Sequence, residues 1–218
     1  MNKSVLTTRP EYEYTTRYIS VWAERVVEFA KQKGFAVFDL AKQRATKQQV
    51  ESMMEKHRPG LVFLNGHGNN SCVTGQDEEI LVEAGLNEEI LSDTITYALS
   101  CSSAQTLGQA AVEKGTRAYI GYSRDFALMF DDEKRTRPQD DKVADLFLTP
   151  SNQVMVSLLK GHTAQEAHES SVKYFKKNLR KLLTSTSTDK ESATIPYLLW
   201  DMQSQVVVGD GLSKLEQN

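Results

Sequence analysis

Short apolar runs alternate with amphipathic stretches along most of the chain. The runs are rich in β-branched and aromatic residues and predict strands at 4–8, 35–40, 61–64, 95–100, 117–122 and 205–208. Apolar residues at helical spacing between them predict helices at 15–33, 46–58, 103–114 and 195–202, with two or three more between 140 and 183. This alternation predicts one α/β domain over residues 1–218, with an open, mostly parallel sheet of about six strands.

Several local signals refine this outline. Thr46 and Thr163, each followed three residues later by Gln or Glu, predict capping boxes at two helix starts. Pro150 predicts a break between a helix at 140–150 and another at 151–161. We expect a hairpin between 72–74 and 80–82, a short acidic helix near 87–91, and polar loops at 123–139 and 184–193.

Two of the predicted strands end in residues that carry chemistry. The run 61–64 is followed by Asn65-Gly66-His67-Gly68, and the run 95–99 by Ser100 and Cys101. In open parallel sheets, ligands and reacting groups lie at the carboxyl ends of the strands. A thiol needs a base within hydrogen-bond reach to attack a carbonyl at neutral pH. His67 and Cys101 are therefore a candidate base and nucleophile.

Two further features would support this pair. If the helix at 103–114 starts just after Cys101, the positive end of its dipole favours thiolate over thiol. The backbone N–H groups of Gly68 and Cys101 are candidates for an oxyanion hole, because a glycine lets a substrate approach the backbone closely.

Order and spacing separate the classes of cysteine enzyme. A phosphatase loop needs Arg six residues after Cys, where Leu107 stands here. A nucleophile elbow needs glycines two residues to either side, where Leu99 and Ser103 stand. A papain-like peptidase has its Cys well before its His, the reverse of the order here.

The remaining arrangement, His-Gly after one strand and Cys 34 residues later after the next, resembles the caspase-like cysteine peptidases. LVFLNGHGN and ITYALSCSSAQTLGQAAVEKGTRAYIGYSRDF are similar to the gingipain and CHAT branch of the clan that also contains caspases and separase. The resemblance covers residues 61–126. It implies a three-layer αβα sandwich, His67 as general base and acid, Cys101 as nucleophile, and the amides of Gly68 and Cys101 as oxyanion hole. Leu-Ser-Cys replaces the commoner small residue before the cysteine.

Members of this family differ in the residue after which they cleave, so acidic groups near the site bear on the substrate. Leu99 replaces the Asp that metacaspases carry two positions before the nucleophile. Asp125, three residues beyond the Ile-Gly-Tyr strand end, is the candidate acid for a substrate Arg or Lys.

Composition narrows the partners and the setting. The formal net charge of −3 gives no reason to expect nucleic acid or an anionic membrane as a partner, and no apolar run is long enough for a membrane span or a secretion signal. With two cysteines we expect no disulfide framework and a reduced, cytoplasmic setting. We expect no cofactor and no metal site, although Cys72 lies close to His67 in sequence. The basic run from Lys173 to Lys181 is interpreted as the solvated face of its helix.

The sequence leaves two candidate functions open, and in both the expected partner is a peptide or protein. The first is a cysteine endopeptidase that works through a His67/Cys101 dyad. The alternative is a non-catalytic caspase-like scaffold that binds a partner or small ligand at the same strand ends. Pairing of two copies through the terminal strand would make either one a homodimer.

Overall fold

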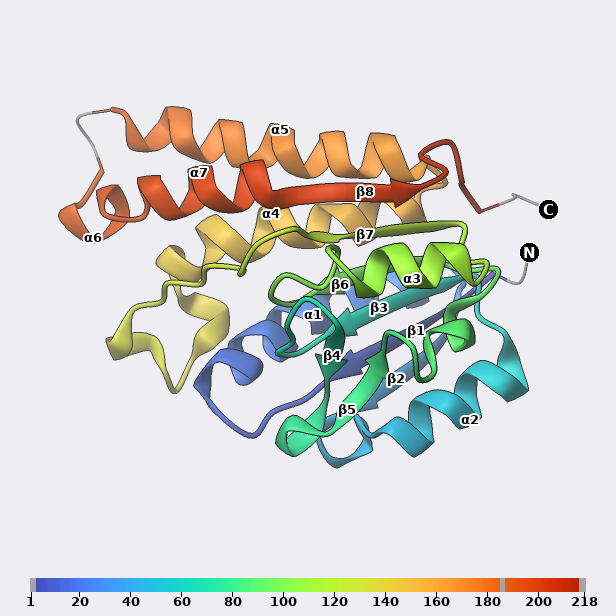
Figure 1. Ribbon diagram of the computed structural model, residues 1–218. Coiled ribbons are helices and arrows are strands. Elements are labelled where there is room, and N and C mark those ends of the chain that lie inside the picture. The colour runs from blue at the N-terminus through green and yellow to red at the C-terminus, as the bar shows by residue number, and fades with distance from the viewer. Residues whose placement is uncertain (1–2, 185–186, 216–218) are drawn as a thin grey trace.

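A six-stranded sheet forms the centre of the molecule in the computed structural model, which describes residues 3–184 and 187–215 (Figure 1). Its strands lie in the order β2-β1-β3-β6-β7-β8. All neighbouring pairs are parallel except β7 and β8, which are antiparallel. The strands are β1 (Ser4–Arg9), β2 (Ala36–Ala41), β3 (Leu61–Asn65), β6 (Ile95–Leu99), β7 (Ala118–Tyr122) and β8 (Gln205–Gly209). The predicted mostly parallel sheet of six strands is confirmed.

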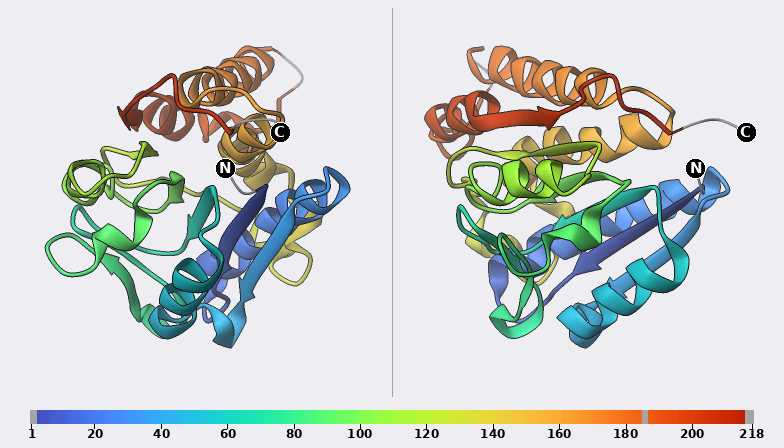
Figure 2. Two further views of the ribbon diagram at one scale, coloured as in Figure 1. Left: turned by 90° about the vertical axis from the view of Figure 1, so that its right-hand side faces the viewer. Right: turned by 45° about the vertical axis from the view of Figure 1, so that its right-hand side comes forward.

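Helices cover both faces of this sheet and give three layers (Figures 1 and 2). One face packs against α1 (Tyr14–Gln32) and α4 (Lys142–Leu159), and α5 (Ala164–Leu182) lies against α4. The other face packs against α2 (Lys47–His57) and α3 (Leu107–Glu113). The remaining helices are α6 (Asp189–Ser192) and α7 (Ile195–Ser204), with α7 beside α5 and next to β8.

Successive side chains of the central strands point to opposite faces of the sheet and contribute to the apolar core on each face. In β3, Leu61 and Phe63 contribute to the core beneath α1 and α4, whereas Val62 and Leu64 contribute to the core beneath α2 and α3. All four side chains are fully buried. A strand covered on both faces needs apolar residues at every position, which explains the continuous run in the sequence.

Outside the central sheet, a small hairpin of β4 (Cys72–Thr74) and β5 (Ile80–Glu83) follows β3, as predicted. A single 3-10 turn (Glu88–Leu91) stands where the acidic helix was expected. The Thr163 capping box is present in full, but Thr46 caps α2 without the reciprocal bond from Gln49. In the predicted loop at 184–193, α6 forms behind a Thr188 capping box, and residues 185–186 lie outside the described residues.

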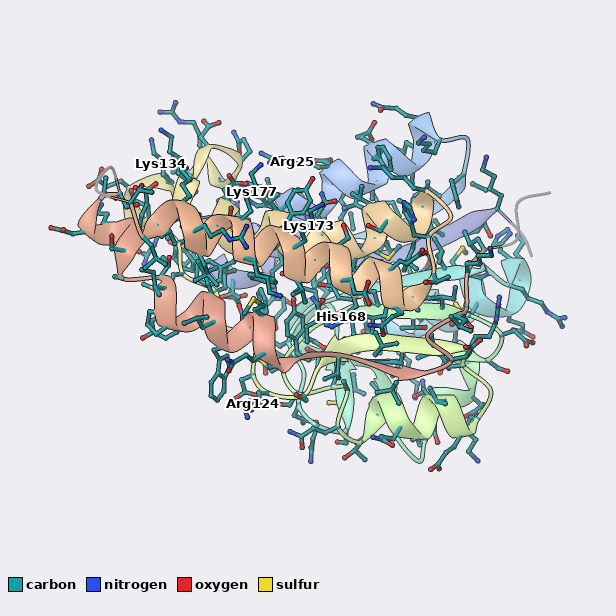
Figure 3. All side chains as sticks on the ribbon, turned by 90° about the horizontal axis from the view of Figure 1, so that it is seen from above. Arg25, Arg124, Lys134, His168, Lys173 and Lys177 are labelled. Atoms are coloured by element: carbon teal, nitrogen blue, oxygen red, sulfur yellow. The ribbon has the colours of Figure 1, made fainter. Side chains whose placement is uncertain are left out.

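The basic residues of α5 project to the solvent, as interpreted from the sequence. Lys173 and Lys177 point away from the molecule in the view from above (Figure 3). Lys176, Arg180 and Lys181 are exposed as well, while the apolar stripe through Phe175 and Leu179 is buried. In the part of the chain that the structure describes, no helix combines the length and the apolar character needed to cross a membrane.

The predicted helix break at Pro150 is wrong, because α4 runs through this residue without interruption. A proline lacks the N–H that would bond to the carbonyl four residues earlier, here that of Leu146. The side-chain amide of Asn178 on α5 donates to the Leu146 oxygen instead, at 2.9 Å. A donor from another helix therefore replaces the missing backbone bond, and no sequence window around Pro150 contains it.

This compensation gives a testable double-mutant cycle. Asn178→Ala leaves the Leu146 carbonyl without its donor, and we expect a loss of about 1 kcal/mol in the free energy of unfolding, measured in urea. For a domain of this size that corresponds to about 2–4 °C in Tm. Pro150→Ala restores a backbone N–H four residues after Leu146, so the cost of Asn178→Ala should disappear in that background. Equal costs in both backgrounds would contradict the interpretation.

Candidate functional site

The loops that carry His67 and Cys101 are neighbours because β3 and β6 pair in parallel, with Asn65 opposite Leu99 at the end of the register. The first loop continues along the second after the strands end. The N–H of Gly66 donates to the Leu99 carbonyl at 3.4 Å. The carbonyl of Asn70 accepts the amides of Thr106 and Leu107 at 3.0 and 2.9 Å, which ties the first loop to the start of α3.

Gly68 lies close to both the hairpin and the Cys101 turn. A Cβ built on Gly68 would lie 2.5 Å from the Cys72 oxygen and 3.2 Å from Cβ of Ser100. A side chain at this position would overlap with the Cys72 carbonyl and press on Ser100. Among the described residues, neither the Gly68 amide nor the Cys101 amide donates a hydrogen bond.

His67 has a carboxylate partner that the sequence reasoning missed. Its Nε2 lies 3.3 Å from Oε1 of Glu13, and the imidazole is 40% exposed. Glu13 lies after the end of β1, the strand next to β3, and caps α1 by accepting the amides of Thr15 and Thr16. Burial works against the charge, but these amide hydrogen bonds hold the pKa of Glu13 below its ordinary value. His67 thus faces a carboxylate that stays ionised at neutral pH.

A signal for Glu13 was present in the sequence. Three neighbouring parallel strands, β1, β3 and β6, end at the same edge of the sheet, and each is followed by a residue with acid-base or nucleophilic chemistry. The polar segment after β1 is therefore a candidate position for a site residue on the same grounds as the other two strand ends.

Hydrogen bonds between hydroxyl groups stabilise the turn that carries Cys101. Ser100 donates to Oγ of Ser103 at 2.9 Å, and the buried Tyr119 hydroxyl donates to the same oxygen at 3.1 Å. The backbone of Ser102 is left-handed, with φ of 52°, a conformation that non-glycine residues adopt rarely. This geometry turns the chain sharply at the cysteine before α3.

The expected activation of Cys101 by a helix dipole is wrong for this conformation. The helix begins at Leu107 and not directly after the cysteine, because residues 102–106 form turns. Burial raises the pKa of the Cys101 thiol; the contact with the Phe126 carbonyl offsets part of this shift, and the nearby carboxyl group of Asp125 adds to it. The thiol of Cys101 therefore stays protonated at neutral pH.

A coil segment, residues 123–128, covers the thiol; we call it the strap. Sγ of Cys101 lies 4.0 Å from the carbonyl oxygen of Phe126. The amide of Ser102 donates to the Arg124 carbonyl at 3.0 Å, and the indole N–H of Trp200 on α7 donates to the Asp125 carbonyl at 2.7 Å. The strap is thus fixed between the Cys101 turn and α7.

Asp125, the acid predicted to face a substrate, lies on this strap. Its side chain is exposed, and its Oδ1 accepts the hydroxyl of Ser102 at 2.6 Å. The structure therefore places it beside the Cys101 turn with one carboxylate oxygen already bonded.

A second acid near Cys101 was not found from the sequence. Asp201 of α7 is fully buried, and its Oδ1 accepts the amide of Ala127 at 2.9 Å. Its Oδ2 has no hydrogen-bond partner within the described ranges. Burial raises the pKa of Asp201 well above its ordinary value, and the single amide bond offsets only part of the shift. An Asp in an amphipathic helix gives no sequence signal for such a position.

Comparison with known proteins identifies this architecture. No protein-family model and no curated protein sequence matches the chain. A crystal structure of the Arg-specific cysteine proteinase gingipain R (RgpB) matches with a TM-score of 0.61 at 11% identity, over 98% of this chain and 48% of that one. The complex of Porphyromonas gingivalis RgpB pro- and mature domains matches with a TM-score of 0.61 at 10% identity, over 96% and 48%. The fold is caspase-like.

The likeness concerns the fold, since the identity is low and the chain spans about half the length of the gingipain chains. It confirms the expected three-layer αβα sandwich. The CHAT side of the predicted resemblance has no counterpart in these two matches.

Both cysteines of this caspase-like chain are free. Cys72 is buried at the start of the hairpin, where burial raises the pKa of its thiol. Within residues 3–184 and 187–215, no group of three His, Cys, Asp or Glu side chains has the geometry to hold a metal ion.

The raised pKa of Cys101 predicts how the thiol reacts. Because only the thiolate is alkylated, modification of Cys101 by iodoacetamide should be slow at pH 7 and rise with an apparent pKa above the ordinary thiol value of about 8.5. Mass spectrometry of the Cys101 peptide between pH 6 and 10 measures this, and the Cys101→Ser variant identifies modification of Cys72. An apparent pKa below 7 would mean that a thiolate is already stabilised at rest.

Proposed function

We propose that this protein is a cysteine peptidase that uses Cys101 as nucleophile and His67 as general base and acid. One observation carries the proposal. The loops that hold His67 and Cys101 follow adjacent parallel strands of a caspase-like fold, and the carboxylate of Glu13 contacts the His67 ring. Three groups with complementary chemistry at one edge of a sheet are the minimum for acyl transfer.

In the proposed reaction His67 removes the proton from Cys101 as the thiolate attacks the carbonyl carbon of the substrate. The resulting oxyanion accepts hydrogen bonds from the N–H groups of Gly68 and Cys101. His67 then gives its proton to the leaving amine, and a thioester remains on Cys101. Water, deprotonated by the same imidazole, hydrolyses the thioester and restores the thiol.

Glu13 acts in this proposal as a positioning residue. Its carboxylate holds one ring nitrogen of His67, which fixes the orientation of the ring and stabilises the imidazolium formed during attack. The α1 amides that bond Glu13 keep the carboxylate in place and charged.

The resting conformation keeps the nucleophile inactive. With the strap against the thiol and the pKa of Cys101 raised, attack requires the strap to move so that a substrate and His67 reach the sulfur. Asp125 on the strap stays our sequence-based candidate for binding a substrate Arg or Lys at the mouth of the site.

The alternative function is a non-catalytic scaffold that binds a protein or small ligand at the same strand ends and forms no covalent bond with it. For either function the partner is a peptide or protein, and nucleic acid and membrane are not proposed. Since both cysteines are free, we propose a reducing, cytoplasmic setting. A homodimer through the edge of β8 stays a prediction.

Covalent labelling tests the peptidase proposal. We expect peptidyl acyloxymethyl ketones with acidic, basic or small P1 residues to include a reagent that labels Cys101, as detected by intact mass and peptide mapping. Cys101→Ala should abolish labelling, and His67→Ala should slow it by about 10²–10⁴-fold, the usual contribution of a general base. Labelling by none of the reagents, with the fold intact by circular dichroism, would favour the scaffold.

Glu13 can be tested by paired variants. Glu13→Gln keeps an oxygen that can accept the α1 amides but removes the charge, and we expect the labelling rate at saturating reagent to fall about tenfold with little change in half-saturation. Glu13→Ala should also cost about 1 kcal/mol in stability through the lost helix cap. If Glu13→Gln labels at the wild-type rate, the carboxylate has no part in positioning His67.

A further inference from the structure

Basic side chains form a stripe along the solvent-facing side of α5, away from the strand ends that carry His67 and Cys101. Spacings of three and four residues place its members on one face of the helix, from which Lys173 and Lys177 point away from the molecule (Figure 3). The stripe is about 12 Å long, because each helical residue adds about 1.5 Å. We define this basic stripe as the exposed residues Lys173, Lys176, Lys177, Arg180 and Lys181.

The stripe lacks the carboxylate partners that other cations of the surface have. Lys31 lies 2.7 Å from Glu28, and Arg135 lies 2.8 Å from Asp132. By contrast, the members of the stripe other than Lys181 form no ion pair and no side-chain hydrogen bond with any residue that the structure describes. The chain as a whole is acidic, with a formal net charge of −3. Positive charge is therefore concentrated on this face and is not balanced locally.

The stability of α5 does not explain the stripe. Basic residues stabilise a helix in its last turn, where they face the negative end of the helix dipole, and only Arg180 and Lys181 lie there. Lys173, Lys176 and Lys177 precede that turn, and like charges three or four residues apart weaken a helix. An anion bound along the stripe would offset this repulsion.

A shallow groove adds apolar surface to this charge. It follows α5 with a volume of about 820 Å³, and its lining includes every member of the stripe except Lys181. The half-buried Val172 and Tyr174 also line it. A polypeptide offers both kinds of contact, since its carboxylates can meet the cations while its side-chain carbons meet the apolar surface.

Carboxylates limit the stripe at both ends. The exposed Glu166 and Glu169 precede Lys173 on the same side of α5. Beyond the other end, Glu191 of α6 is close enough to Lys181 for the two charges to interact. A nucleic acid duplex or a membrane surface would extend past both ends and meet these carboxylates. A short segment of about four extended residues, or about two helical turns, fits between them.

We propose that the basic stripe of α5 binds a short segment of another protein that is rich in Asp and Glu. The inference goes beyond the proposed function, because the stripe shares no residue with the strand ends or with the strap. Binding should therefore be the same whether or not Cys101 acts as a nucleophile.

The test uses two fluorescein-labelled peptides of equal length, decaglutamate and decaglutamine. By fluorescence anisotropy in about 50 mM NaCl, we expect the full chain to bind decaglutamate at least about tenfold more tightly than decaglutamine. The affinity for decaglutamate should fall as the salt concentration rises, since salt screens exposed charges. Equal affinity for the two peptides would overturn the proposal, and this comparison needs no variant.

Two matched double variants locate the binding site. Lys173→Gln/Lys177→Gln keeps good helix formers and removes two charges of the stripe, and we expect it to weaken decaglutamate binding about tenfold. Its Tm should not fall, because repulsion within α5 is reduced. Lys56→Gln/Lys114→Gln removes two charges from exposed positions on α2 and at the end of α3, and should change binding less than about twofold. Equal losses in both variants would mean that the peptide responds only to net charge, which would overturn the site.

Two further probes decide the class of partner. A DNA duplex of about 20 base pairs and vesicles with about 30% phosphatidylserine should both bind more weakly than decaglutamate at the same ionic strength. Tighter binding of either one, lost in Lys173→Gln/Lys177→Gln, would overturn an acidic polypeptide as the partner.

The Cys101→Ala variant separates this proposal from the peptidase. It should bind decaglutamate as the wild type does, although it no longer reacts with peptidyl ketones. Stripe-dependent binding without labelling of Cys101 by any reagent supports the docking surface and removes the peptidase. Labelling of Cys101 with equal affinity for decaglutamate and decaglutamine supports the peptidase and removes the docking surface.

Discussion

The parallel pairing of β3 with β6 is the constraint on which the rest of the site depends. Because both strands run in the same direction in register, the residues that follow Asn65 and Leu99 emerge at one edge of the sheet. For this reason His67 lies beside the Cys101 turn although 33 residues separate the two in the sequence. The apolar run of β3 is buried on both faces, which places this pairing at the centre of the sheet.

Two carboxyl groups from distant parts of the chain lie near this pair of loops. Glu13 reaches His67 from the end of β1, while Asp201 approaches the Cys101 region from α7, near the other end of the chain. The amides of a helix start stabilise the charged form of Glu13. Asp201 is desolvated, and among the described residues its side chain accepts one hydrogen bond, from the strap. The surroundings of Glu13 therefore favour the charged form, and those of Asp201 the neutral form.

The strap lies between these features. It contacts the thiol of Cys101, and its Ala127 amide is the one donor to the Asp201 side chain among the described residues. In the proposed function, a ligand must replace the contacts that the strap makes with Cys101 and Asp201. These contacts therefore stabilise the closed conformation and oppose catalysis. The caspase-like fold provides the strand ends that carry His67 and Cys101, and in the proposed function the strap is the segment that moves.

The sequence by itself determined the sheet, most helix positions, and the His67 and Cys101 strand ends, because these depend on local periodicity and on the apolar strand runs. It did not determine that α4 continues through Pro150, since the compensating donor of Asn178 comes from another helix. Nor did it determine the protonated state of Cys101, which burial by the strap decides. Asp201 became part of the site only through tertiary structure, because it lies far along the chain from Cys101. Glu13 follows a predicted strand end, but only the tertiary structure decided its contact with His67. Hydrophobic patterning specifies which elements form, whereas the electrostatics of the site depend on contacts between elements distant in sequence.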